Sequence, residues 1–260
     1  MKSRLINTGT KKSLQKMKLF FVLLTSAFIC GPSTSQLVGL GEQGLKNYLR
    51  LVMDNFRNVM KVGSTKPRIP ILDPLLIRDQ LVKKREERFN ITAQFSNIVI
   101  FGLSSYELDA FEVNLDDLKL TIGLSIPLLD AKGKYNLEGI VIKIFPLTGN
   151  GDVRVMAHNV KISGKAEFKV TPEGYLKVSK LDLGLDFSYV SINFQNLLGS
   201  KSVSDFVNRL LSLLGRPIFQ SFKNDLLDDL ENSLRKDMDK GLMKYKLYEI
   251  LQGSIDPRDG

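Results

Sequence analysis

The chain has 260 residues, of which 43% are hydrophobic, and its 37 basic and 28 acidic residues give a formal net charge of +9. Six of the basic residues and none of the acidic ones lie before residue 36, so the rest of the chain has 31 basic against 28 acidic residues, a net charge of only +3. This distribution argues against a nucleic-acid-binding protein, which usually has a concentrated basic stripe. The densest basic run, Lys83–Arg85, is followed at once by Glu86 and Glu87.

The first 35 residues have the pattern of a secretory signal peptide. An apolar run of 12 residues, Leu19–Cys30, follows the basic Lys18 and precedes the small residues Ser33–Ser35. An uncleaved membrane anchor is the alternative, but a helix that crosses a bilayer needs about 20 apolar residues. We therefore predict a signal peptide with an N-terminal extension over residues 1–35, with Met17 as an alternative start. The mature protein is expected to be secreted, with no integral membrane span.

The only cysteine, Cys30, lies inside this predicted signal peptide. A mature chain of about 225 residues would then have no disulfide, and it is long enough to be stabilised by burial alone. Asn90-Ile91-Thr92 is a glycosylation sequon. It predicts a glycan on Asn90 if the chain enters the secretory pathway.

Residues 42–61 are predicted to form an amphipathic helix, because their apolar residues recur at spacings of three and four. Gly63 and Pro67 predict the end of this helix. Residues that precede proline avoid helical backbone angles, so the segment 68–75 is expected to begin as extended chain.

Between residue 91 and about residue 194, apolar and polar residues alternate, as in strands that bury one face. The alternation is clearest over residues 118–126, 160–170 and 181–189. The pattern predicts four or more long antiparallel strands joined by hairpins, with strong curvature where glycines interrupt them. Turn signals lie at Pro127, Asp130–Gly133, Gly149–Asp152 and Pro172–Gly174.

Helical spacing returns over residues 202–240. Gly215-Arg216-Pro217 interrupts the apolar stripe of this segment and predicts a kink or a split in the helix. The predicted fold class is therefore α+β, in which a highly curved antiparallel sheet wraps a long C-terminal helix, with an N-terminal amphipathic helix. We expect one domain over residues 36–252, a flexible tail over residues 253–260, and an elongated apolar interior that could hold a lipid-sized ligand.

Three segments resemble motifs of a known family. They are Ile69–Leu75, a proline-rich entry to the sheet; Phe101–Ser104, a Gly-Leu-Ser strand start; and Gly139–Gly151, a central strand that runs into glycines. With the order of elements, they make the chain similar to the insect juvenile-hormone-binding and takeout-like proteins of the tubular lipid-binding superfamily. The N-terminal helix is also similar to that of the group 7 mite allergens. The cysteine pair that is common in the juvenile-hormone-binding family is absent, so the resemblance does not fix juvenile hormone as the ligand.

Residues suited to catalysis are scarce. His158 is the only histidine and the predicted mature chain has no thiol, which excludes a Cys–His pair and a zinc site of Cys/His type. There is no G-x-S-x-G sequence, and Gly149–Asp152 lacks the lysine of a phosphate loop. An acidic cluster on the C-terminal helix lacks the pattern of a calcium loop and is interpreted as a solvated face; it comprises Asp225, Asp228, Asp229 and Glu231. We predict that the protein is not an enzyme and has no cofactor or metal site.

The remaining candidates for function are apolar and aromatic side chains. The hydroxyl groups of three tyrosines could orient the polar end of a ligand in a dry pocket; these are Tyr48, Tyr106 and Tyr189. The residues expected to line the ligand site are Tyr48, Phe56, Leu75, Phe101, Tyr106, Phe187, Tyr189, Phe206, Phe219 and Phe222.

The leading hypothesis is a secreted carrier that reversibly binds a small lipophilic ligand, such as a terpenoid hormone, a fatty acid or a pigment, in an apolar tunnel. One alternative is a lipid-surface recognition protein of innate defence, which would need an exposed basic patch. Another is a secreted protein-interaction module whose pocket has filled in. A cell-surface receptor or a second copy of the chain is a further candidate partner; nucleic acid is not.

Overall fold

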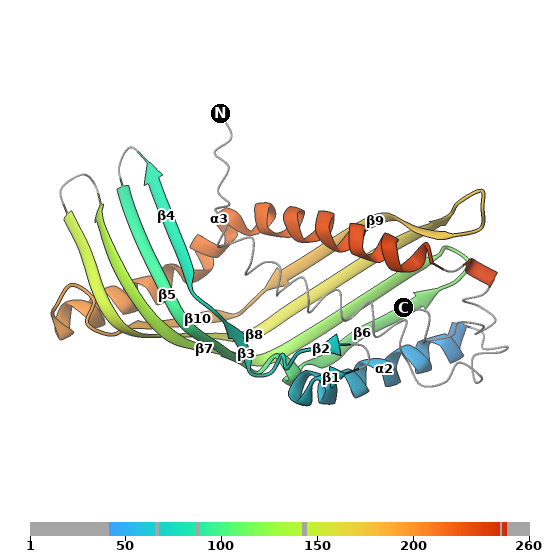
Figure 1. The fold of residues 1–260 in the computed structure, drawn as a ribbon, viewed down its shortest axis with the longest axis horizontal. Helices are drawn as coiled ribbons and strands as arrows, with labels where there is room; N and C mark the ends of the chain where they lie inside the picture. Colours follow the sequence, from blue (N-terminus) through green and yellow to red (C-terminus); the bar gives the residue numbers. More distant parts are fainter. Residues whose placement is uncertain (1–41, 66–67, 87–88, 142–144, 245, 249–260) are drawn as a thin grey trace.

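The computed structural model describes residues 42–65, 68–86, 89–141, 145–244 and 246–248. The predicted signal peptide and the predicted tail over residues 253–260 lie outside the described residues. The fold is α+β, with a large antiparallel sheet and a long C-terminal helix, which confirms the predicted fold class. Figure 1 shows the sheet bent between two arms, with the long helix running beside both of them.

Two helices, ten strands and one short 3₁₀ turn make up the described chain. Strands β1 and β2 form a small separate pair, and the other eight strands form one sheet. In chain order the elements are α2 (Glu42–Val62), β1 (Ser64–Thr65), β2 (Arg68–Ile69), β3 (Leu75–Ile77), β4 (Gln80–Glu86), β5 (Phe89–Phe101), η2 (Leu103–Ser105), β6 (Glu107–Asn114), β7 (Lys119–Val141), β8 (Phe145–Val170), β9 (Leu176–Asp186), β10 (Tyr189–Phe194) and α3 (Lys201–Leu242).

The N-terminal helix agrees with its prediction. α2 ends at Val62, and Gly63 follows with a positive φ of 77° while its N–H donates to the carbonyl of Val59 at 2.7 Å. Glycine adopts this left-handed conformation without the steric cost that a side chain adds, which is why it so often ends helices.

Strands β7 and β8 are the long central strands of the sheet, and they pair with each other along the whole length of β7. β6 and β9 flank residues 119–125 of β7 and 161–170 of β8; we call this part the four-stranded arm. β5 and β10 flank the other ends of β7 and β8, and β4 adds to β5; we call this part the five-stranded arm.

The turns predicted at Pro127, Asp130–Gly133 and Gly149–Asp152 are wrong, because all three segments lie inside β7 and β8. The glycines serve close packing instead of chain reversal. A Cβ on Gly149 would lie 2.6 Å from the hydroxyl of Tyr135, so only glycine fits there without a shift of its neighbours. The turn predicted at Pro172–Gly174 does join β8 to β9, with Gly174 at a φ of 91°.

The apolar pattern changes phase where the two arms meet. On β8 the apolar positions are odd-numbered up to Ala157 and even-numbered from Val160 onward, and Asn159 lies between them with a φ of 50°. On β7 the same shift occurs between Ile126 and Leu129, which lie opposite Val160 and Ala157. Side chains alternate between the two faces of a strand. The apolar residues therefore change between odd-numbered and even-numbered positions at the same place in both strands.

The proline-rich entry and the Gly-Leu-Ser segment contact each other. Asp73 accepts hydrogen bonds from the backbone N–H of Gly102 (3.0 Å), the backbone N–H of Ser104 (2.8 Å) and the hydroxyl of Ser104 (2.5 Å). Gly102 has a φ of 95°, and a Cβ there would lie 2.2 Å from the carbonyl oxygen of Leu128. These contacts hold Asp73, just before β3, against the segment that follows β5.

The C-terminal helix is continuous through Pro217, so the predicted split is wrong. Its first half lies along the edge of the sheet at β10. The N–H of Ile192 donates to the hydroxyl of Ser212 at 2.8 Å, and the N–H of Phe194 donates to the side-chain oxygen of Asn208 at 2.9 Å. The amide of Asn208 also donates to the carbonyl of Phe194 at 3.0 Å. Polar side chains of the helix therefore satisfy backbone groups that an edge strand would otherwise leave unpaired.

The second half of α3 covers the edge at β9 with carboxylates. The N–H of Leu183 donates to Glu231 at 2.7 Å, and the N–H of Val178 donates to Asp239 at 2.8 Å. The interpretation of Glu231 as part of a solvated face is therefore wrong. Its carboxylate is half-buried and bonded to the sheet.

Candidate functional site

The strongest candidate site is an apolar face on the four-stranded arm. Strand pairing places Phe111, Ile122, Gly164 and Leu183 in one row across β6, β7, β8 and β9. The rows on either side are apolar as well. They are Val113, Leu120, Ala166 and Leu181 on one side, and Leu108, Leu124, Ile162 and Leu185 on the other.

The two helices pack at opposite margins of this face (Figure 1). α2 contacts β6, and its Met53, Phe56 and Met60 join the main buried cluster with Leu124 and Ile126. α3 contacts β9, and its apolar residues at this end, including Leu230 and Leu234, are buried. The margins of the face are thus closed by helix side chains.

The side chains of the described residues do not fill the middle of the face. Ile122, Ile162 and Leu183 remain half-exposed although they lie in the centre of an apolar surface. Gly164 has no side chain, and among the described residues a Cβ at this position would meet only Leu183, at 3.6 Å. In contrast, a Cβ on Gly184 of the neighbouring strand would lie 2.2 Å from the hydroxyl of Ser163. The space above Gly164 can therefore accept apolar atoms that the described residues do not supply.

Five of the predicted ligand residues lie together beside this face. Phe56, Leu75 and Tyr106 belong to the buried cluster, and Phe187 packs against it. The ring of Phe187 lies 5.0 Å from that of Phe219, which joins the cluster to α3. This grouping contains the residues from the proline-rich entry, the N-terminal helix and the long helix that the sequence singled out.

The hydroxyl of Tyr106 is already engaged within the protein. It donates to the carbonyl of Met53 in α2, and Arg57 lies over the ring, 4.8 Å from its centroid. Burial raises the pKa of Tyr106 far above its ordinary value, so this hydroxyl stays protonated. Tyr106 therefore fastens α2 to the sheet, and its proton is not available to a ligand in this arrangement.

Other predicted residues lie elsewhere. Phe101 is exposed with the amine of Lys132 5.4 Å from its ring centroid, and Tyr189 is exposed and stacked on His158 at 4.1 Å. Phe206 is 63% exposed on the outward side of α3. The side chains of Tyr48 and Phe222 lie outside the described residues. Asn90, the predicted glycosylation site, is exposed on β5, where a glycan would have access.

Sequence reasoning did not single out Gly164, Ile122 or Leu183 as site residues. Their signal was present, because each falls in a run of strict alternation. Alternation identifies the buried face of a strand, but it does not show which part of that face the helices leave uncovered.

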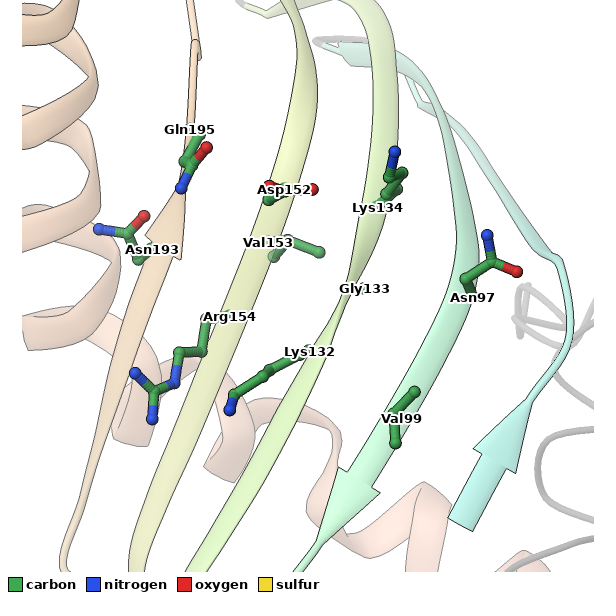
Figure 2. A pocket seen from close by; sticks show the side chains of 10 residues that line it. All are labelled: Asn97, Val99, Lys132, Gly133, Lys134, Asp152, Val153, Arg154, Asn193 and Gln195. Atoms are coloured by element: carbon green, nitrogen blue, oxygen red, sulfur yellow. The ribbon is translucent and has the colours of Figure 1, made fainter. Parts of the chain in front are cut away.

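A second depression, of about 380 Å³, is lined mostly by residues with polar or charged side chains and spans β5, β7, β8 and β10 of the five-stranded arm (Figure 2). Arg154 donates from Nε and a terminal nitrogen to the two carboxylate oxygens of Asp130, at 2.8 and 2.9 Å, and Lys132 lies 3.2 Å from the same carboxylate. These hydrogen bonds hold the pKa of Asp130 below its usual range. Its lining differs from that of the predicted apolar tunnel; it comprises Asn97, Val99, Lys132, Gly133, Lys134, Asp152, Val153, Arg154, Asn193 and Gln195.

Two further properties bear on function. Among the residues that the structure describes, no group of three histidine, cysteine or acidic side chains is placed to hold a metal ion. No helix in the described part of the chain is both long and apolar enough to cross a bilayer.

The arrangement of a long helix beside a bent antiparallel sheet defines the fold class seen in the crystal structure of Epiphyas postvittana Takeout 1. That structure superposes with a TM-score of 0.52 at 18% sequence identity, over 76% of this chain and 94% of Takeout 1. The chain also matches the model of the haemolymph juvenile hormone binding protein family over residues 19–252, and it belongs to that family. The resemblance predicted from the sequence motifs is thereby confirmed.

Two other comparisons add no support for the assignment to a family. A crystal structure of lipopolysaccharide binding protein has a TM-score of 0.43 and 14% identity, over 81% of this chain and 40% of that protein. A comparison with curated proteins finds no match to the chain.

Proposed function

We propose that the protein is a secreted carrier that reversibly binds one small lipophilic molecule on the apolar face between α2 and α3. The observation that supports this most directly is the space above Gly164 that the described residues leave unfilled, at the centre of a face that is apolar across four strands. Membership of the juvenile hormone binding protein family and the predicted signal peptide support the same proposal.

Burial of the ligand supplies the binding energy. Burial of apolar surface contributes about 25 cal/mol per Å², so a ligand that buries about 300 Å² gains about 7.5 kcal/mol before the costs of association. The rows around Gly164 contribute aliphatic and aromatic side chains. Such a face favours a ligand that is largely hydrocarbon, such as a terpenoid, a fatty acid or a pigment, and the function is binding without a catalytic step.

The first experiment identifies the ligand. The protein secreted from insect cells is analysed by native mass spectrometry, and the bound material is then extracted with organic solvent and identified. We expect one hydrophobic molecule per chain. A protein that emerges empty and takes up no member of a panel of terpenoids and fatty acids would contradict the proposal.

A second experiment tests the place of binding. Gly164→Phe should fill the space above β8 and weaken the binding of cis-parinaric acid, a fluorescent fatty acid, by at least about tenfold. Lys165→Leu is the matched control, since Lys165 is the exposed neighbour on the opposite face of the same strand. Thermal unfolding of both variants should remain cooperative. Equal loss of affinity in the two variants would show that the ligand binds elsewhere.

A further inference from the structure

The first half of α3 exposes an apolar row to solvent, whereas most amphipathic surface helices turn their apolar side toward the protein. Its outward side is a row of large apolar side chains that are 40–77% exposed, with Leu213 the most exposed at 77%. We call this row the α3 stripe; it consists of Val203, Phe206, Leu210, Leu213, Leu214 and Ile218. A helix of a water-soluble protein usually turns such a row toward the core.

The orientation of this half is fixed by polar contacts on its other side. Ser204, Asn208 and Ser212 follow one another at intervals of four residues and bond to the backbone around β10. Ser204 and Asn208 are buried. Gly215 continues the same side, where a Cβ would lie 2.0 Å from Val190. Rotating the helix to hide the α3 stripe would break these hydrogen bonds, so the stripe stays outward while the helix remains docked on β10.

Charge distinguishes this half of the helix from the other. Residues 201–224 have four basic residues and one acidic residue; the basic ones are Lys201, Arg209, Arg216 and Lys223, and the acidic one is Asp205. Arg216 is paired with Asp186 at the end of β9. Residues 225–242 have six acidic residues against three basic ones. The apolar stripe thus lies on the basic half of α3.

These features together match an anionic lipid surface. A helix that lies in a membrane interface has exposed apolar residues on one side and basic residues flanking them. A second copy of the chain fits less well, because a two-fold contact between two α3 stripes would bring the two basic halves together.

We propose that the α3 stripe is a docking surface for membranes that contain anionic lipids, on which the first half of α3 lies parallel to the surface. Phe206, Leu210 and Leu213 enter the boundary between headgroups and acyl chains, while Arg209, which lies next to the stripe on the helix, contacts the headgroups. The docking surface is separate from the apolar face around Gly164, so membrane binding and ligand binding can succeed or fail independently.

Vesicle sedimentation tests the proposal. The full secreted protein is mixed at low ionic strength with vesicles of phosphatidylcholine alone or of phosphatidylcholine with about 30% phosphatidylserine. We expect binding to the anionic vesicles, and raising the salt to about 0.5 M should weaken it because salt screens the headgroup attraction. Leu213→Glu should reduce binding at least about tenfold, and Arg209→Glu should reduce binding to anionic vesicles in the same direction.

Leu51→Glu is the matched control, because Leu51 is a 51% exposed leucine on α2, away from the α3 stripe. It should bind vesicles as the unmodified protein does. Circular dichroism of each variant establishes that the fold persists, which is expected since both leucines are exposed. The proposal is overturned if Leu213→Glu and Leu51→Glu bind equally well. It is also overturned if the unmodified protein binds no vesicles, or if it forms a dimer that Leu213→Glu dissociates while vesicle binding is unchanged.

Discussion

The two halves of α3 pack on the same sheet by opposite means. The first half turns Ser204, Asn208 and Ser212 toward the β10 edge and leaves the apolar row of the α3 stripe outside. The second half buries Leu227, Leu230 and Leu234 and leaves polar residues outside. One continuous helix therefore has an apolar side that faces the protein at one end and the solvent at the other.

The difference indicates that hydrogen bonds from a helix to the unpaired backbone of an edge strand can determine which side of the helix faces the sheet. An edge strand has backbone N–H and C=O groups that need partners, and an unpaired buried group costs about 1–3 kcal/mol. In the first half of α3 the partners are neutral side chains, two of them buried. In the second half, Glu231 and Asp239 accept hydrogen bonds from backbone N–H groups of β9, and the leucines of the helix pack against the protein.

The largest expected effect is the loss of stability on truncating a buried leucine in the second half of α3, compared with an exposed leucine in the first half. Leu230→Ala should destabilise the protein by about 2–5 kcal/mol, because Leu230 is only 3% exposed and its removal leaves a cavity. Leu213→Ala should change stability by less than about 0.5 kcal/mol, because its side chain is 77% exposed. Urea unfolding followed by circular dichroism measures both. Similar losses in the two variants would mean that the α3 stripe is buried in solution, and the contrast between the halves would fail.

A smaller effect should follow from removing a polar contact of the first half. Asn208→Ala deletes both hydrogen bonds to Phe194 and leaves that strand's N–H without its partner, at a cost of about 1–3 kcal/mol. Asn224→Ala is the control, since Asn224 is exposed on the same helix. Native-state hydrogen exchange should show faster exchange of the Phe194 amide in the first variant only. Unchanged protection of that amide would show that the helix does not hold the edge of β10.

The smallest effect concerns the ion pair between Arg216 and Asp186, 3.0 Å apart, which ties α3 to the end of β9. The hydrogen bond from the N–H of Phe187, and then that from Arg216, hold the pKa of Asp186 below its usual value. A carboxyl with a lowered folded-state pKa stabilises the protein above its unfolded pKa of about 3.9, and this contribution disappears as the pH falls through the folded value.

Asp186→Asn should therefore lower stability at pH 7 by a few tenths of a kcal/mol, because the pair is exposed and screened by solvent. The difference from the unmodified protein should vanish at about pH 2. Melting temperatures measured between pH 2 and pH 7 test this, and a difference that grows on acidification would contradict the assignment.

Much of the local structure was predictable from the sequence, and the failed turn prediction at Gly149–Asp152 shows one limit. Gly63 ended α2 as expected, and Pro172–Gly174 formed a turn. Gly149–Asp152 had an equally strong turn pattern but lies inside β8, where Gly149 allows Tyr135 and Leu197 to approach the strand. A glycine that permits a turn and a glycine that permits a close contact look the same in a sequence.

The candidate site shows the same limit. Phe56, Leu75, Tyr106 and Phe187 were singled out by resemblance and by apolar position, and the structure gathers them in one region. Phe101, Tyr189 and Phe206 had the same residue types and patterns, and they are exposed. Period and residue type identify an apolar side of an element, but the neighbouring elements decide whether that side is covered.

The sequence by itself determined the α+β class, the amphipathic N-terminal helix, the long alternating strands and the family, because these depend on periodicity, helix-ending residues and motifs along the chain. The tertiary structure alone decided that β7 and β8 run uninterrupted through both arms, that only Leu183 among the described residues approaches the space above Gly164, and that the first half of α3 turns an apolar row outward. These features depend on which distant segments meet in the fold. The orientation of α3 in particular depends on the backbone groups of β10 that need hydrogen-bond partners, and that requirement arises only when the strands are assembled into a sheet.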